Sequence, residues 1–169
     1  MLKIGLPLTV LIAVLDQLSK WRIEEFMRPE GMNETPFYGA PTIDVTSFFM
    51  VVMAWNRGAS FGFLNQASDW VGWAFTALAA VVAAALLFWM SRAENKLLAI
   101  ALGFIAGGAI GNAIDRIRFG AVADFLYFHW GDWFFPAFNL ADSAITVGAG
   151  LLILESLFKR PGSSYKEAP

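Results

Sequence analysis

The sequence predicts an all-α membrane protein of one domain, with four transmembrane helices and a small β-sheet with loop or helical segments on the outer face. Hydrophobic residues make up 57% of the 169 residues and charged residues only 15%, against about 25% in soluble proteins. Four segments are long enough to cross a hydrocarbon core, which takes about 20 residues. Between them lie two stretches of the β-branched and aromatic residues that strands prefer.

We expect the four spans at about residues 4–23, 70–90, 97–115 and 139–158. The second is the clearest, because it contains no charged residue. The first resembles a secretory signal peptide, but no cleavage site of small residues follows its apolar part, so we expect it to be retained. The third contains GFIAGGAIG (103–111), and small residues of this kind favour close packing between transmembrane helices.

The connecting regions differ in length and character. Residues 24–69 and 116–138 form two long regions, which lie on the same side because two spans separate them. The segment VTSFFMVVMAW (45–55) predicts one or two strands. The segment DFLYFHWGDWFFPAF (124–138) has aromatic runs on both sides of Gly131-Asp132, which predicts a hairpin turn. Both regions therefore contribute to a sheet outside the membrane.

The other side of the membrane carries the N-terminus, the short loop 91–96 and the tail 159–169. Lys and Arg are equally numerous on the two sides, with six on each. The short loop and the tail carry their basic residues next to span ends, where the positive-inside rule is strongest. We therefore expect both termini in the cytoplasm and the two long regions on the outer face.

Composition excludes several functional classes. A formal net charge of −2 excludes a basic protein built to bind nucleic acid, and no Gly-rich phosphate loop is present. The absence of Cys rules out disulfides, a zinc–thiolate site and a thiol nucleophile. A single His rules out a His-rich metal site. We expect neither a cofactor nor a metal.

Polar residues from separate segments converge on one membrane depth. They lie in DQLSK (16–20), WNRGASF (55–61), GNAIDR (111–116), VADF (122–125) and FNLADS (138–143). The first and third spans run outward and the fourth runs inward, so all these groups lie at the outer boundary of the membrane. Random placement of charged residues would not favour one boundary in this way.

Most of these residues have a structural interpretation. Asp16 and Lys20 are four apart and share a helix face, as in a helix-stabilising pair. Asp115 with Arg116 would anchor the end of the third span. Other polar residues would satisfy backbone groups that have no water to bind: Asn139 as the N-cap of the fourth span, and Asn56 and Asn112 as ties between loop backbone and helix ends.

Asp124 and Asp142 are harder to explain structurally. If both face one cleft, like-charge repulsion and desolvation raise the pKa of one of them. One carboxyl is then protonated and the other ionised near neutral pH. Such a pair can activate a water and protonate a leaving amine. The alternative is a small ion- or proton-coupled membrane transporter, in which the pair binds a cation or relays protons.

Four motifs, DQLSK, WNRGASFGF, GGAIGNAIDRIRFGAVADF and FPAFNLADSAITVGAG, resemble the bacterial lipoprotein signal peptidases, or signal peptidase II. They occur in the family's order and cover nearly the whole chain. The resemblance implies an aspartic endopeptidase of the bacterial inner membrane that cuts prolipoprotein signal peptides just before a diacylglyceryl-modified Cys.

The resemblance also implies roles for individual residues. The catalytic pair falls on Asp124 and Asp142, and the supporting positions fall on Asp16, Lys20, Asn56, Gly108, Asn112, Arg116, Asn139 and Ala141. It further implies both termini in the cytoplasm, a small extracytoplasmic sheet cradle, membrane lipid around the site, and inhibition by the cyclic peptide antibiotic globomycin.

Overall fold

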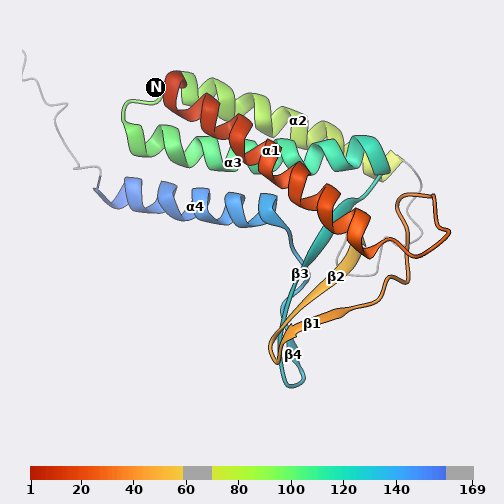
Figure 1. Ribbon diagram of the computed structural model, residues 1–169. Coiled ribbons are helices and arrows are strands. Elements are labelled where there is room, and N and C mark those ends of the chain that lie inside the picture. Colours follow the sequence, from red (N-terminus) through yellow and green to blue (C-terminus); the bar gives the residue numbers. More distant parts are fainter. Residues whose placement is uncertain (59–69, 159–169) are drawn as a thin grey trace, which may run out of the picture.

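Four long helices and one small sheet make up the described part of the chain (Figure 1). The computed structural model describes residues 1–58 and 70–158. The helices are α1 (Leu2–Met27), α2 (Trp70–Ser91), α3 (Lys96–Phe119) and α4 (Leu140–Phe158). All four contain a segment long and apolar enough to cross a membrane, judged by length and composition. The predicted fold class is confirmed.

Helix α1 extends four residues beyond the predicted end of its span at residue 23. Glu24 and Arg28 form an ion pair one turn apart, and the Thr35 hydroxyl donates to the Glu24 carboxylate at 3.0 Å. These contacts hold the last turn of α1 outside its apolar segment. Residues 28–42 then lead to the sheet without a helix, and residues 59–69 and the predicted tail 159–169 lie outside the described residues.

Helix α3 occupies the centre of the bundle and packs against the other three helices (Figure 1). Its glycines allow this close approach. A Cβ at Gly103 would lie 2.9 Å from the Gly5 carbonyl oxygen, and one at Gly107 would lie 2.7 Å from Ile12 Cβ. On the opposite face, Gly108 packs against Ala141 of α4. The predicted close packing through small residues is confirmed.

The four strands form one antiparallel sheet in the order β1-β2-β3-β4. They are β1 (Ile43–Thr46), β2 (Phe49–Asn56), β3 (Val122–Trp130) and β4 (Trp133–Phe134). The predicted hairpin turn lies between β3 and β4, where Gly131 adopts φ 56°, a conformation that glycine takes without strain. Figure 1 shows the sheet at one end of the bundle, and the N-terminus and the end of α4 at the other.

A small aromatic core joins the sheet to α3. Trp55 of β2 makes edge-to-face contacts with Phe37, at a ring distance of 5.8 Å, and with Phe119 at the end of α3, at 5.5 Å. Ala121 and Ala123 complete this buried cluster. Edge-to-face pairs have a preferred geometry, so the cluster fixes the start of β3 relative to α3.

Two short connections then place the start of α4 beside β3. Helix α3 ends at Phe119, and the left-handed φ of 68° at its C-cap residue, Gly120, turns the chain into β3. Before α4, Phe138 exchanges backbone hydrogen bonds with Leu126: its N–H donates at 3.0 Å and its carbonyl accepts at 2.9 Å. The first turn of α4 therefore lies next to Asp124.

Candidate active site

Asn139 joins Asp124 and Asp142. Its side-chain Nδ2 donates to Asp124 Oδ1 at 2.7 Å, and its backbone N–H donates to Asp142 Oδ2 at 3.3 Å. In return, the Asp142 backbone N–H donates to Asn139 Oδ1 at 3.0 Å. Asn139 is thus the N-cap of α4, as predicted, and it also connects a carboxyl group of the sheet with one of the helix.

Two further amides complete the environment of the two carboxyl groups. Asn56 Nδ2 donates to Asp124 Oδ2 at 3.1 Å, and Asn112 Nδ2 donates to Asp142 Oδ1 at 2.8 Å. Each of the four carboxyl oxygens therefore accepts one N–H. Because a carboxyl oxygen has two lone pairs, every one of them retains capacity for a proton, a water or a substrate group.

The orientation of these amides follows from groups that can only donate. The Lys20 ammonium donates to Asn112 Oδ1 at 2.9 Å, and the Gly58 backbone N–H donates to Asn56 Oδ1 at 2.9 Å. With its oxygen so engaged, each amide turns its NH₂ group toward a carboxyl. The expectation that Asn112 ties loop backbone to a helix end is wrong, because its side chain binds other side chains of the site.

Lys20 lies at the centre of a buried cluster of charged residues from α1 and α3. Its ammonium contacts Asp16 Oδ2 at 2.8 Å and Asp115 Oδ2 at 2.9 Å. The second oxygen of Asp16 accepts the Ala141 backbone N–H at 2.9 Å. The predicted Asp16–Lys20 pair is confirmed, and it also attaches α1 to the first turn of α4.

Arg116, Gly108 and Ala141 complete the set of predicted positions. Arg116 lies within electrostatic range of Asp124 and Asp142, and its Nη1 donates to the Asn112 carbonyl at 3.4 Å. Its buried Nε has no hydrogen-bond partner in residues 1–58 and 70–158. Gly108 and Ala141 contribute no polar side chain, and their close packing seats α4 against α3.

Burial, and after it the nearby charge of Asp142, raise the pKa of Asp124 from 3.8 to about 7, although hydrogen bonds from Asn56 and Asn139 oppose the shift. The side chain is 3% exposed. A carboxyl with this pKa changes its protonation near neutral pH. Asp124 can therefore bind or release a proton near neutral pH, as a general acid or base must.

Comparison with known proteins agrees with the family that the sequence motifs resemble. The family model for signal peptidase (SPase) II matches residues 8–158. The chain belongs to the signal peptidase II family. It is therefore a peptidase, and the family resemblance read from its motifs is confirmed.

The peptidase is 47% identical over 159 residues to a lipoprotein signal peptidase of Burkholderia ambifaria, covering 94% of this chain and 90% of the relative. A lipoprotein signal peptidase of Burkholderia multivorans is 46% identical, and the match again covers 94% of this chain and 90% of the relative. A bacterial membrane enzyme solved by the in meso method superimposes with a TM-score of 0.74 at 26% identity, covering 98% of this chain and 94% of that one. The peptidase is thus a multi-pass membrane protein of a bacterial enzyme family.

Proposed function

We propose that the peptidase removes signal peptides from bacterial prolipoproteins, cutting just before a diacylglyceryl-modified Cys, with Asp124 and Asp142 as the catalytic pair. The observation that carries the proposal is the shared hydrogen-bond network in which Asn139 joins the two carboxyl groups. The lipoprotein signal peptidases that resemble the chain over 94% of its length support the substrate class.

In this mechanism one carboxyl is ionised and accepts a proton from the attacking water. The other is protonated and donates a hydrogen bond to the scissile carbonyl, which stabilises the developing negative charge. When the tetrahedral intermediate collapses, its C–N bond breaks and the protonated carboxyl gives its proton to the leaving amine. The proton taken from the water leaves the pair with one proton again. We assign the initial proton to Asp124, because burial raises its pKa to about 7, and the water-activating role to Asp142.

The polar residues around the pair hold it in this arrangement. Asn56, Asn112 and Asn139 direct N–H groups at the carboxyl oxygens, so neither carboxyl is free to rotate away from its partner. Such fixed donors stabilise a reacting geometry without reorganisation during the reaction. Globomycin, a cyclic peptide antibiotic, is the inhibitor that we expect to occupy this site.

The position of the pair suits a substrate that is itself a membrane-spanning helix with a lipid on its Cys. The chain would lie in the inner membrane with both termini in the cytoplasm and the pair near the outer face. Figure 1 supports one part of this placement: the N-terminus and the end of α4 lie together, opposite the sheet. The scissile bond and the lipid would meet the pair where both leave the membrane.

The direct test uses the purified peptidase in proteoliposomes with one prolipoprotein in two forms, with and without diacylglycerol on its Cys. We expect cleavage of the lipidated form alone, and mass spectrometry should find the modified Cys as the first residue of the product. Cleavage at another bond, or equal cleavage of both forms, would contradict the proposal. Ion flux without cleavage would instead support the transporter alternative.

A further inference from the structure

We propose that Asp115 is a positioning residue for both carboxyl groups of the pair, an inference that rests on the proposed function. Asp115 lies near the end of α3 and is 1% exposed. Its Oδ2 accepts the Lys20 ammonium at 2.9 Å and the Ala123 backbone N–H at 3.1 Å, and its Oδ1 accepts Gln17 Nε2 at 2.7 Å. These three donors come from α1 and β3.

The contact with Ala123 leads directly to Asp124. Ala123 immediately precedes Asp124 in β3, and its carbonyl accepts Asn139 Nδ2 at 3.2 Å. By holding the Ala123 N–H, Asp115 fixes the Val122–Ala123 peptide unit, one residue before Asp124, relative to the end of α3. A displacement of that unit would move the Asp124 carboxyl away from Asn139.

The contact with Lys20 leads to Asp142. An ammonium group has three N–H donors, and those of Lys20 are directed to Asp16, Asp115 and Asn112. If Asp115 stops accepting, one donor is released and the ammonium can turn away from Asn112. Asn112 Oδ1 would then keep only the hydrogen bond from Asn139 Nδ2, at 3.1 Å, and the Asn112 NH₂ group would be held less firmly toward Asp142.

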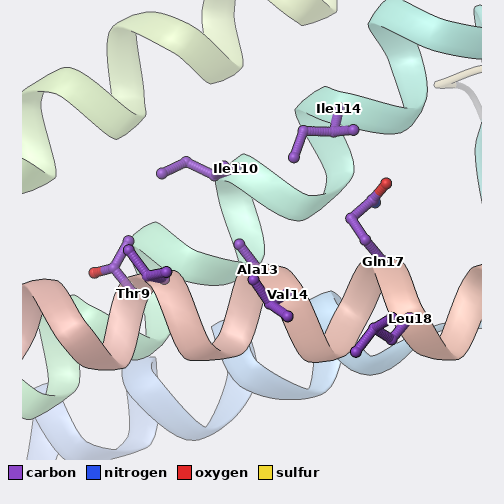
Figure 2. Close-up of a pocket in the computed structure, with 8 residues that line it drawn as sticks. Thr9, Ala13, Val14, Gln17, Leu18, Ile110 and Ile114 are labelled. Atoms are coloured by element: carbon purple, nitrogen blue, oxygen red, sulfur yellow. The ribbon is translucent and has the colours of Figure 1, made fainter.

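Gln17 of α1 holds Asp115 from the groove between α1 and α3. Its Nε2 also donates to the Gly111 carbonyl at 3.1 Å. Figure 2 shows Gln17 extending from α1 toward the turn of α3 that carries Ile114, at the edge of an apolar groove of about 360 Å³ between the two helices. In this position the half-buried Gln17 gives Asp115 a polar partner at the edge of an otherwise apolar groove.

The principal test is Asp115→Asn, which preserves size but removes the charge and replaces one acceptor oxygen with an NH₂ group. That group cannot accept from Lys20, Ala123 or Gln17. We expect kcat per folded enzyme to fall by about 10- to 100-fold, because a misplacement of about 1 Å at a reacting group has an effect of this size. KM should change less than about twofold, since no substrate contact is removed.

The matched control is Glu155→Gln, which removes the charge of a carboxylate at the other end of the bundle. Glu155 Oε1 accepts Asn95 Nδ2 at 2.8 Å, and it makes no contact with the pair. Its kcat should equal that of the wild type. If Asp115→Asn acts only by destabilising the fold, thermal unfolding will change while kcat per folded enzyme will not, and the inference is then wrong.

A second variant keeps the inference testable if Asp115→Asn does not fold. Gln17→Met removes one donor to Asp115 but leaves the buried charges intact, and an apolar side chain suits the groove. We expect a smaller fall in kcat, of about 3- to 10-fold, again without a change in KM. Values within twofold of the wild type for this variant would overturn the inference. If Asp124→Asn retained cleavage, the proposed function itself would fail, so the two failures are distinguishable.

Discussion

At the scale of single residues, Asp124 combines a structural penalty with a proposed catalytic role. Its carboxyl lies in β3, away from water, and its pKa is raised to about 7 by burial and by the charge of Asp142. In the unfolded chain the same carboxyl ionises near pH 4. Between pH 4 and 7 the folded protein therefore binds more protons at this group than the unfolded chain does, and its free energy of unfolding falls as the pH rises.

The pH dependence of stability follows from this difference. Asp124→Asn removes the titration, so the melting temperature of the variant relative to the wild type should rise by several degrees between pH 5 and pH 8. Thermal unfolding in detergent across this range measures it. Asp44→Asn, at an exposed carboxyl of β1, is the control and should leave the difference constant. If the melting temperatures of Asp124→Asn and the wild type changed with pH by the same amount, Asp124 would not titrate in this way.

At the scale of helices and strands, the site depends on how closely α3 and α4 pack. A Cβ at Gly108 would lie 2.8 Å from Ile145 Cγ1 and 3.2 Å from the Ala141 carbonyl carbon. Asp16 of α1 also accepts the Ala141 N–H, so α4 cannot move away from α3 at this point without straining that hydrogen bond. The first turn of α4, and Asp142 with it, would have to shift.

We therefore expect Gly108→Ala to lower stability by about 1–3 kcal/mol, as overpacking does, and to reduce kcat by at least about tenfold. Gly150→Ala is the matched control, because a Cβ there would meet no atom within 4 Å; it should retain activity and be equally or more stable. Thermal unfolding and a cleavage assay measure both effects. Full activity in Gly108→Ala would contradict the account of this packing.

The elements could be predicted from the sequence because length and apolar composition decide which segments span a membrane. The end of α1 could not, since its last turn is held by contacts of Glu24 with Arg28 and Thr35 that involve a loop. The partners of Asn112 were also unpredictable: they are Lys20, Asp142 and Asn139, on two other helices and the connection before α4. No pattern in the sequence predicts the contact between Gln17 and Asp115, because it depends on how α1 packs on α3.

At the scale of the whole molecule, the sheet lies at one end of the bundle and the N-terminus and the end of α4 at the other (Figure 1). Asp124 belongs to the sheet and binds Asn139, which caps α4, so the pair lies at the sheet end. The proposed function requires the first end to face the outside. The chain contains no Cys, so single cysteines can report on this orientation. Ser47, in the turn between β1 and β2, and Arg92, after α2, are exposed positions at opposite ends.

A membrane-impermeant maleimide applied to intact spheroplasts should label the Ser47→Cys variant and leave the Arg92→Cys variant unlabelled. After detergent lysis both should react, which confirms that each thiol is accessible. The reverse pattern would place the pair on the cytoplasmic side and contradict the proposed topology. Because the chain has no background thiol, the comparison needs no compensating substitution.

In the proposed function, Asp124 and Asp142 act as one catalytic pair. Single-turnover cleavage of a diacylglyceryl prolipoprotein by Asp124→Asn and by Asp142→Asn tests it most directly, with thermal unfolding of each variant as evidence of folding. We expect each variant to fold and to cleave at least about 10³-fold more slowly than the wild type, since each loses one of the two proton transfers. A folded variant that cleaves within tenfold of the wild-type rate would contradict the claim.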